Sequence, residues 1–356
     1  MGLSSFVEAI HATQPDLIVP GDDLATCHLH HLHAQALRRG QAGEWLRVLI
    51  ERSLGSPESF PVVYARTAFM DLARDAGIRA PKTEVIANLS ALKKWAAHVG
   101  FPTVLKANGT SGGDGVRVVA SFEEAENAFR TLQAPPLLLR AVKRAVADRD
   151  KTLLWPSLFR RRSVVNAQEF VPGREATSAV ACWNGTVLAC LHFEVINKRD
   201  PKGPSSVVRL IENADMSAAA EVMVRRLNLS GLHGFDFMLE AHTGDAFLIE
   251  INPRATQVGH LCLGPGRDLP AALYAALSGG EVRTAPKITE NDTIALFPQE
   301  WMRDPASPFL QSAHHDVPWD EPELLRAFSE KRKEQGALVF QTPPLPKLSP
   351  VRLQRL

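Results

Sequence analysis

Two carboxylates and one amide in the second half of the chain have the spacing of metal ligands. Glu250 and Asn252 lie two residues apart in the apolar run FLIEINPR, so a strand there places both side chains on one face. The run GFDFMLE carries Asp236, and a hairpin with a loop over 241–245 places Asp236 opposite Glu250. Two close carboxylates repel each other without a cation, and oxygen ligands of this kind suit Mg²⁺. We expect these three residues to bind Mg²⁺, with Mn²⁺ as a second candidate ion; an acid pair neutralised by Arg or Lys elsewhere is the alternative.

A glycine-rich stretch begins at Lys106 with the sequence KANGTSGGDGV. A Walker A loop would carry Lys and Ser or Thr after its last glycine, and a dinucleotide fingerprint would carry a glycine that opens a helix; the stretch has neither. Strands are predicted over 102–107 and 116–120, which makes the stretch a β-turn-β flap. Backbone N–H groups of glycines can close over phosphate oxygens, and Lys106 adds a point charge. The pattern indicates a phosphate-binding flap, with a plain surface hairpin as the alternative.

The segment QEFVPGRE lies between these two motifs. Its apolar strand end could supply backbone hydrogen bonds to the edge of a purine. The acids Glu169 and Glu175 are near in the sequence and could accept hydrogen bonds from an exocyclic amine and from ribose hydroxyls. Acids at strand ends are often only solvated, so this segment carries little weight by itself.

Together and in this order, the motifs FPTVLKANGTSGGDGV, QEFVPGRE, GFDFMLE and FLIEINPR resemble the ATP-grasp superfamily over about residues 66–280. In that family two α+β lobes clasp ATP, and most members activate a carboxylate as an acyl phosphate that an amine, thiol or other nucleophile attacks. The resemblance implies an ATP- and Mg²⁺-dependent carboxylate ligase. A small-molecule kinase of the same fold and a non-catalytic ATP-binding module are the alternatives.

The resemblance also implies a role for each matching position. Asp236, Glu250 and Asn252 match its magnesium ligands. Lys106 matches the lysine that reaches the nucleotide phosphates and adenine, and Arg254 an arginine that holds the transferring phosphoryl group or the intermediate. Either Lys198 or Arg209, which bracket a turn, is expected to supply a cation for the γ-phosphate. The other expected ATP-binding residues are Arg66, where the family usually has a lysine, the flap glycines Gly112, Gly113 and Gly115, and Gln168, Glu169, Val171 and Glu175 around adenine and ribose.

Helix and strand signals supply the elements that must position these residues. Capping residues and apolar spacing predict helices at about 24–39, 67–77, 90–100 and 216–227. Apolar runs predict β structure over 163–194, with a hairpin turn at Asn184-Gly185. The mixture is α+β and α/β, and the resemblance implies an ATP-grasp fold of two α+β lobes that clasp the nucleotide.

The expected organisation has three parts. Residues 1–62 are expected to form a partial Rossmann-like α/β segment, with a buried strand at 15–20, where the family has a longer domain. Residues 63–285 form the ATP-grasp domain, with a small lobe at about 90–170 and a large lobe at about 171–285. Residues 286–356 form a C-terminal appendage with a Pro-rich tail.

Composition excludes several other classes of protein. The 356 residues are 45% hydrophobic and 22% charged, which is typical of soluble globular proteins and excludes disordered or fibrous chains. Lys and Arg number 40 against 39 Asp and Glu, so charge gives no argument for a nucleic-acid or membrane partner. No apolar run reaches the ~18 residues that span a bilayer. The four cysteines lack a Cys-x-x-Cys spacing and fit a reducing cytoplasm.

We therefore expect a cytoplasmic protein whose partners are small molecules, a carboxylate and a nucleophile. A homodimer is left open. The histidine run CHLHHLH suggests a metal cluster, but on a helix only pairs such as His28 and His31 could meet, so packing or surface roles are expected. The run Arg160–Arg162 is expected to be solvated.

Overall fold

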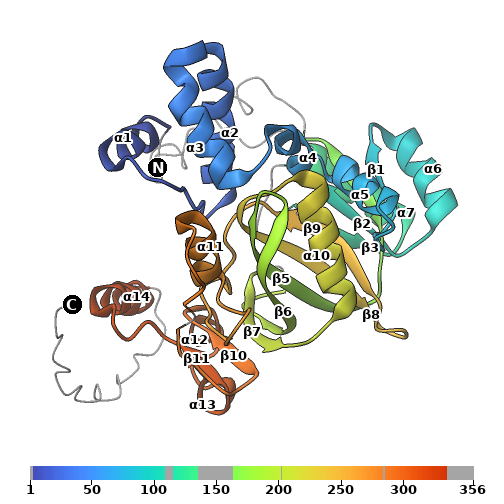
Figure 1. Ribbon diagram of the computed structural model, residues 1–356. Helices are drawn as coiled ribbons and strands as arrows, with labels where there is room; N and C mark the ends of the chain where they lie inside the picture. The colour runs from blue at the N-terminus through green and yellow to red at the C-terminus, as the bar shows by residue number, and fades with distance from the viewer. Residues whose placement is uncertain (1–2, 109–114, 135–162, 202, 284, 335–356) are drawn as a thin grey trace, which may run out of the picture.

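The computed structural model describes residues 3–108, 115–134, 163–201, 203–283 and 285–334, which form two β-sheets with helices around them (Figure 1). The small sheet is antiparallel, with strand order β1-β4-β2-β3. Its strands are β1 Thr83–Ile86, β2 Thr103–Ala107, β3 Val116–Val119 and β4 Val165–Glu169. Helices α6 Leu89–Val99 and α7 Phe122–Gln133 share one apolar core with this sheet.

The large sheet has the strand order β11-β10-β7-β6-β5-β8-β9. Its central strands are β5 Gly173–Trp183, β6 Thr186–Lys198, β7 Ser205–Leu210, β8 Gly231–Glu240 and β9 Ala246–Asn252. Helices α10 Ala214–Leu227 and α5 Arg66–Asp75 join one apolar core beside the sheet, and α11 Leu269–Ser278 joins a second core. Asn184 and Gly185 both have positive φ, 47° and 76°, and make the predicted turn between β5 and β6.

Helices make up the segment before these lobes. They are α1 Leu3–Thr13, α2 Asp23–Arg38, α3 Glu44–Leu54 and α4 Phe60–Tyr64, with short 3₁₀ turns at Gly40–Gly43 and Pro57–Ser59. The prediction of a strand at 15–20 is wrong. The predicted α/β character of the segment, which depended on that strand, is therefore wrong as well. Pro15 and Pro20 have no N–H to donate to a ladder, and the N–H of Ile18 donates to Ser53 Oγ at 2.9 Å.

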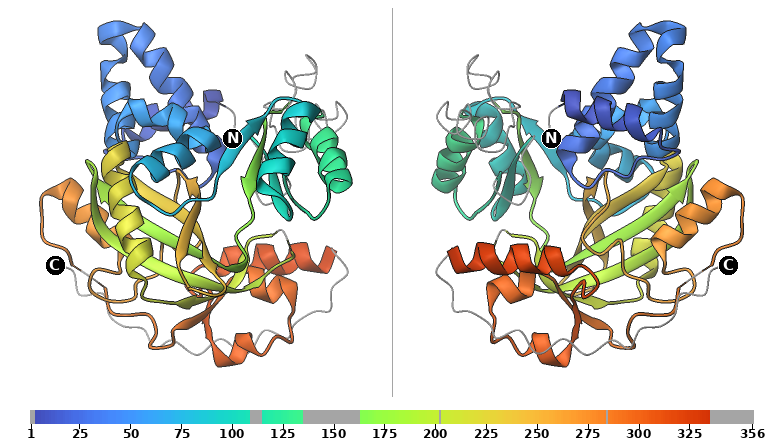
Figure 2. Two further views of the ribbon diagram at one scale, coloured as in Figure 1. Left: turned by 90° about the vertical axis from the view of Figure 1, so that its right-hand side faces the viewer. Right: turned by 90° about the vertical axis from the view of Figure 1, so that its left-hand side faces the viewer.

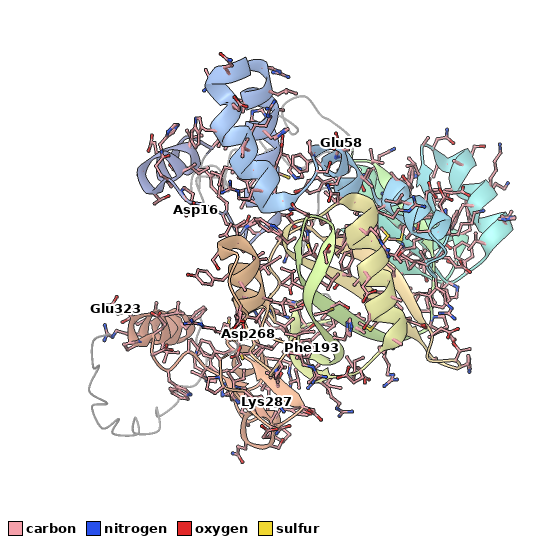
Figure 3. All side chains as sticks on the ribbon, viewed as in Figure 1. Asp16, Glu58, Phe193, Asp268, Lys287 and Glu323 are labelled. Carbon is pink, nitrogen blue, oxygen red and sulfur yellow. The ribbon has the colours of Figure 1, made fainter. Side chains whose placement is uncertain are left out.

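The C-terminal residues extend the large sheet and do not only pack against it. Strand β10 Thr293–Leu296 pairs with β7, and β11 His314–Asp316 pairs with β10. The short helices α12 Gln299–Arg303 and α13 Phe309–Ser312 and the longer α14 Pro322–Glu334 surround these strands. Asp268, labelled in Figure 3, caps α11 through the Ala271 N–H and accepts from the Ala285 N–H at 3.2 Å, which anchors the chain on its way to β10.

Figures 1 and 2 show the N-terminal helices and the small sheet as two separate projections from the large sheet, with the C-terminal elements at the opposite end. Strand β1 begins the small sheet at residue 83, seven residues ahead of the expected boundary at about 90. Among the residues described, no helix is both long enough and apolar enough to cross a bilayer.

Candidate active site

A cavity of about 1120 Å³ lies between the two sheets, and the N-terminal helices contribute to its wall. The small sheet supplies residues from β2, β3 and β4, and the large sheet supplies residues from β5, β6, β8 and β9. The cavity gathers most of the residues singled out in the sequence. Those lining it are Arg66, Lys106, Gln168, Glu169, Val171, Glu175, Lys198, Asp236, Glu250, Asn252 and Arg254.

The three expected metal ligands lie together on the β8–β9 hairpin. The loop between the two strands covers residues 241–245, as predicted. Asp236 pairs in register with Glu250, also as predicted, and Asn252 pairs with Gly234. Asp236 accepts hydrogen bonds from Thr177 Oγ1 at 2.9 Å and from Asn252 Nδ2 at 2.8 Å. Strand pairing thus fixes two carboxylates and one amide on the cavity face of the sheet.

The two carboxylates of this set, Glu250 and Asp236, have different charged neighbours. Burial raises the pKa of Glu250, but the charges of Arg66 and Lys106 outweigh that effect and hold its pKa below the usual value. Arg66 Nη1 lies 2.9 Å from Glu250 Oε1. Burial, and then the charge of Glu250, raise the pKa of Asp236. The hard oxygens of the half-buried Asp236 carboxylate, beside those of Glu250 and Asn252, fit a Mg²⁺ ion.

Lys106 faces this acid pair from the small sheet. It lies on β2 between Val116 and Asn166 of the neighbouring strands and is only 5% exposed. Burial lowers the pKa of its ammonium group to about 8, although the nearby charge of Glu250 opposes the shift. A buried cation in a cavity is suited to bind an anion, because little water is left to compete for it.

The expected adenine and ribose residues lie along β4 and β5. Gln168 is buried and its Nε2 donates to Thr83 Oγ1 at 3.1 Å, while Glu169 Oε2 accepts from the Lys82 N–H at 3.3 Å. Glu175 Oε1 lies 3.0 Å from Lys198 Nζ. Lys198 therefore lies in the cavity, paired with the acid expected at the ribose.

Arg209, the alternative to Lys198, lies on the other face of the large sheet. Val195, which lines the cavity, pairs with Val208, whereas Arg209 pairs with Glu194. Neighbouring residues of a strand point to opposite faces, so Arg209 is directed away from the cavity. The prediction of Arg209 as a phosphate cation does not fit this register.

The glycine flap is described only at its end. The carbonyl of Gly115 accepts from the Ala107 N–H at 2.9 Å, which continues the pairing of β2 and β3. Gly112 and Gly113 lie outside the described residues, as do the run 160–162 and the Pro-rich tail. The histidine run lies on α2 and packs there, since His30 stacks on Phe60 at 3.9 Å between ring centroids and His33 Nε2 is 2.7 Å from Glu51 Oε1.

Arg254 is held by residues from two distant parts of the chain. Its Nε donates to Asp23 Oδ1 at 3.0 Å, its Nη2 donates to Asn252 Oδ1 at 3.2 Å, and its Nη1 donates to the Ala255 carbonyl at 3.3 Å. Sequence reasoning missed Asp23. The pair Asp22-Asp23 marks the start of a helix, but nothing in the sequence connects it with a residue 231 positions away.

Two domain families match the sequence. The ATP-grasp domain family matches residues 149–258, and the family described as "Carbamoyl-phosphate synthase L chain, ATP binding domain" matches residues 65–137. The carbamoyl phosphate synthase large chain of Kineococcus radiotolerans is 23% identical over 236 residues, which are 64% of this chain and 19% of that protein. The chain thus spans only a small part of that relative.

Solved structures share the fold. Biotin carboxylase from Campylobacter jejuni, in a β,γ-ATP complex, has a TM-score of 0.55 and 16% identity over 82% of this chain and 61% of its own. The biotin carboxylase domain dimer of Hydrogenobacter thermophilus 2-oxoglutarate carboxylase, with MgADP, ADP and bicarbonate, has a TM-score of 0.53 and 14% identity over 80% and 58%. An ADP complex of purK, N5-carboxyaminoimidazole ribonucleotide synthetase, has a TM-score of 0.53 and 15% identity over 79% and 66%. The chain spans less than two thirds of each of these proteins.

Proposed function

Because the chain belongs to the ATP-grasp superfamily, we propose that it is an ATP-dependent ligase that activates a carboxylate as an acyl phosphate for attack by an amine or another nucleophile. One observation carries the proposal: the acids Asp236 and Glu250 and the cations Lys106 and Arg254 all line one cavity. Such a set can bind a polyanion and also meet the charge that develops as phosphate is transferred.

Each lobe has its own part in binding ATP. Lys106 is assigned to the phosphates, with Lys198 as a second cation beside the γ-phosphate. Gln168, Glu169 and Val171 are assigned to the adenine edge and Glu175 to the ribose. These assignments are supported by the cavity, because all six residues line it.

Asp236, Glu250 and Asn252 are assigned as the residues that would hold Mg²⁺. When bound, the ion would neutralise phosphate oxygens of the nucleotide. Arg66, which lies 2.9 Å from Glu250, keeps that side chain ionised and oriented. Thr177 orients Asp236 by donating to its Oδ1.

The proposed chemistry has two steps. A carboxylate oxygen attacks the γ-phosphorus of ATP while the bond to the ADP oxygen breaks, which gives an acyl phosphate and ADP. The nucleophile then attacks the acyl carbon, and inorganic phosphate leaves. The contribution of the protein is positioning and charge neutralisation, and the planar fork of Arg254 suits a phosphoryl group or a tetrahedral intermediate.

The test is a trapping experiment with the full chain. Incubation with ATP, Mg²⁺, a panel of carboxylates and hydroxylamine should yield ADP and a hydroxamate, the product of hydroxylamine and an acyl phosphate. Arg254→Ala should bind ATP but lose the hydroxamate, because the charge it meets develops during transfer. A stable phosphorylated alcohol in place of the hydroxamate would favour the kinase, and ATP binding without ADP from any panel member would favour the binding module.

A further inference from the structure

We propose that Asp23 is a positioning residue, which holds Arg254 in the orientation that meets the transferred phosphoryl group. The proposal rests on the proposed function, because Arg254 is assigned there to that group. It makes the docking of α2, in the helical segment ahead of the lobes, a condition of fast turnover. The N-terminal helices would then be part of the reaction centre as well as a wall of the cavity.

The contacts of Arg254 are the first support. A guanidinium group has five N–H donors in a fixed plane. Three are engaged, by Asp23 at Nε, by Asn252 at Nη2 and by the Ala255 carbonyl at Nη1. Among the described residues no further acceptor is bonded to it, so one N–H on each terminal nitrogen is available for two oxygens of one phosphoryl group. The charged bond to Asp23 is the strongest of the three, since both partners are ionised.

The backbone around this pair is the second support. Thr26 is fully buried, and its Oγ1 donates to the Pro253 carbonyl at 2.9 Å. The Ala255 N–H donates to the Pro20 carbonyl, also at 2.9 Å. Hydrogen bonds from the segment 20–26 therefore flank Arg254 on both sides. These bonds hold the start of α2 against the residues that follow β9, next to the guanidinium group.

Asp23 is expected to affect the binding of a phosphate ion and the rate of phosphoryl transfer in different ways. An arginine side chain has many rotamers, and fixing it before the reaction removes an entropy cost from the transition state. The negative charge of Asp23 beside the guanidinium also weakens the binding of an anion in the ground state. Loss of Asp23 should therefore slow turnover while phosphate binds at least as well. A merely structural role would weaken both.

Asp23→Asn and Asp23→Ala test this, with Asp22→Asn as the matched control. Asp22 is the N-cap of α2, and Asn keeps that cap while it removes the same charge one residue away. We expect kcat to fall about tenfold in Asp23→Asn and about 100-fold in Asp23→Ala, with the KM for ATP within about twofold. Binding of inorganic phosphate to the enzyme with Mg²⁺ and ADP, measured by calorimetry, should tighten about threefold in Asp23→Ala. Asp22→Asn should match the wild type in all three.

A double variant separates positioning from a general effect on the fold. If Asp23 acts through Arg254, Asp23→Ala should have no further effect on kcat in the Arg254→Ala background. The urea midpoints of unfolding should be non-additive in the same way, which tests the contact whether or not the wild type turns over. Additive losses, or weaker phosphate binding in Asp23→Ala, would overturn the proposal. Absence of any ATP-dependent product in the wild type would count against the ligase alone, because the phosphate and urea measurements do not depend on turnover.

Discussion

Lys106 combines a positive charge with almost complete burial, and its protonation should be visible in nucleotide binding. Burial lowers its pKa from 10.5 to about 8, so the ammonium group is mostly charged at pH 7 and mostly neutral at pH 9. Bound phosphate favours the charged form and raises that pKa again. The affinity for Mg²⁺ with a non-hydrolysable ATP analogue should therefore fall as the pH rises through about 8, by up to about tenfold at pH 9.

Calorimetric titration at pH 7, 8 and 9 measures this effect. Lys106→Met is the control, because its side chain has similar length and no charge at any pH. It should bind the analogue more weakly at pH 7 and show a flatter pH profile. The same slope in both proteins would show that another group causes the dependence, and wild-type affinity in Lys106→Met would remove Lys106 from the phosphate site.

Glu250→Gln tests the assigned metal ligands. The substitution keeps the shape of the side chain and removes one carboxylate, so we expect Mg²⁺-dependent turnover to fall by at least about 100-fold. The ion pair with Arg66 is also lost, but Glu250 is 32% exposed at its side chain and the free energy of unfolding should fall by only about 1 kcal/mol. ADP release and a urea titration measure the two quantities. Normal Mg²⁺-dependent activity in Glu250→Gln would disprove the metal assignment.

At the scale of elements, Glu300 on α12 joins the C-terminal segment to the large sheet. It is fully buried and accepts from Ser206 Oγ at 2.7 Å and from Arg303 Nε at 2.8 Å. Burial alone would raise its pKa, but the bonds from Arg303, Ser206 and Ser307 lower it to about 2. Glu300→Gln should lower the free energy of unfolding by about 2–4 kcal/mol at pH 7, because it leaves a buried network partly unsatisfied.

The pH dependence of this loss has a definite sign. A carboxyl group whose folded pKa lies below its unfolded value stabilises the fold above the unfolded pKa. The contribution of Glu300 should thus be complete above about pH 5 and disappear as the pH falls from 4.5 towards 2. Urea unfolding at pH 7, 5 and 3 should show the difference between wild type and Glu300→Gln shrinking. Glu290→Gln, an exposed acid in the same segment, should change stability by less than about 0.5 kcal/mol; a similar loss in both variants would contradict the role of Glu300.

Some elements could be predicted from the sequence because their signals are local. The spacing of Asp236 and Glu250 around a short loop gave their pairing, which the register of β8 and β9 confirms. The hairpin turn at Asn184-Gly185 is another case, since both residues have positive φ. Features that depend on distant pairing could not be predicted. Strand β10 joins the large sheet next to β7, more than 80 residues earlier in the chain, and no local signal names that partner.

At the site, the direction of Arg209 and the contact of Asp23 also depend on distant pairing, so the sequence could not predict them. The sequence shows which residues of β7 share a face. Which of the two faces lines the cavity depends on the register of β7 with β6, where the pairing shifts between Val195 and Asn197. Asp23 reaches Arg254 only because the N-terminal helices dock on the end of β9. The quoted motifs contain most of the expected residues that line the cavity, but Arg66 and Lys198 line it from outside those motifs.

At the scale of the whole molecule, the cavity lies between two separately packed lobes, with Lys106 from the small sheet and the acid pair from the large sheet. A ligand that contacts both lobes should stabilise the folded chain by linkage, by about 2.7 kcal/mol at a concentration 100 times its Kd. For a chain of this size we expect a rise in Tm of about 3–6 °C with Mg²⁺ and a non-hydrolysable ATP analogue.

Each lobe's share of that stabilisation can be measured separately by thermal unfolding. The rise in Tm should be smaller with the analogue in EDTA, because the acid pair then repels the phosphates, and it should nearly vanish in Lys106→Met, which acts from the small sheet alone. Glu290→Gln, far from the cavity in the C-terminal segment, should keep the full rise. If Lys106→Met kept the full rise, the nucleotide would be held by the large lobe only. If EDTA had no effect, the acids Asp236 and Glu250 would not hold a metal that the nucleotide shares, and binding would depend on the cations alone.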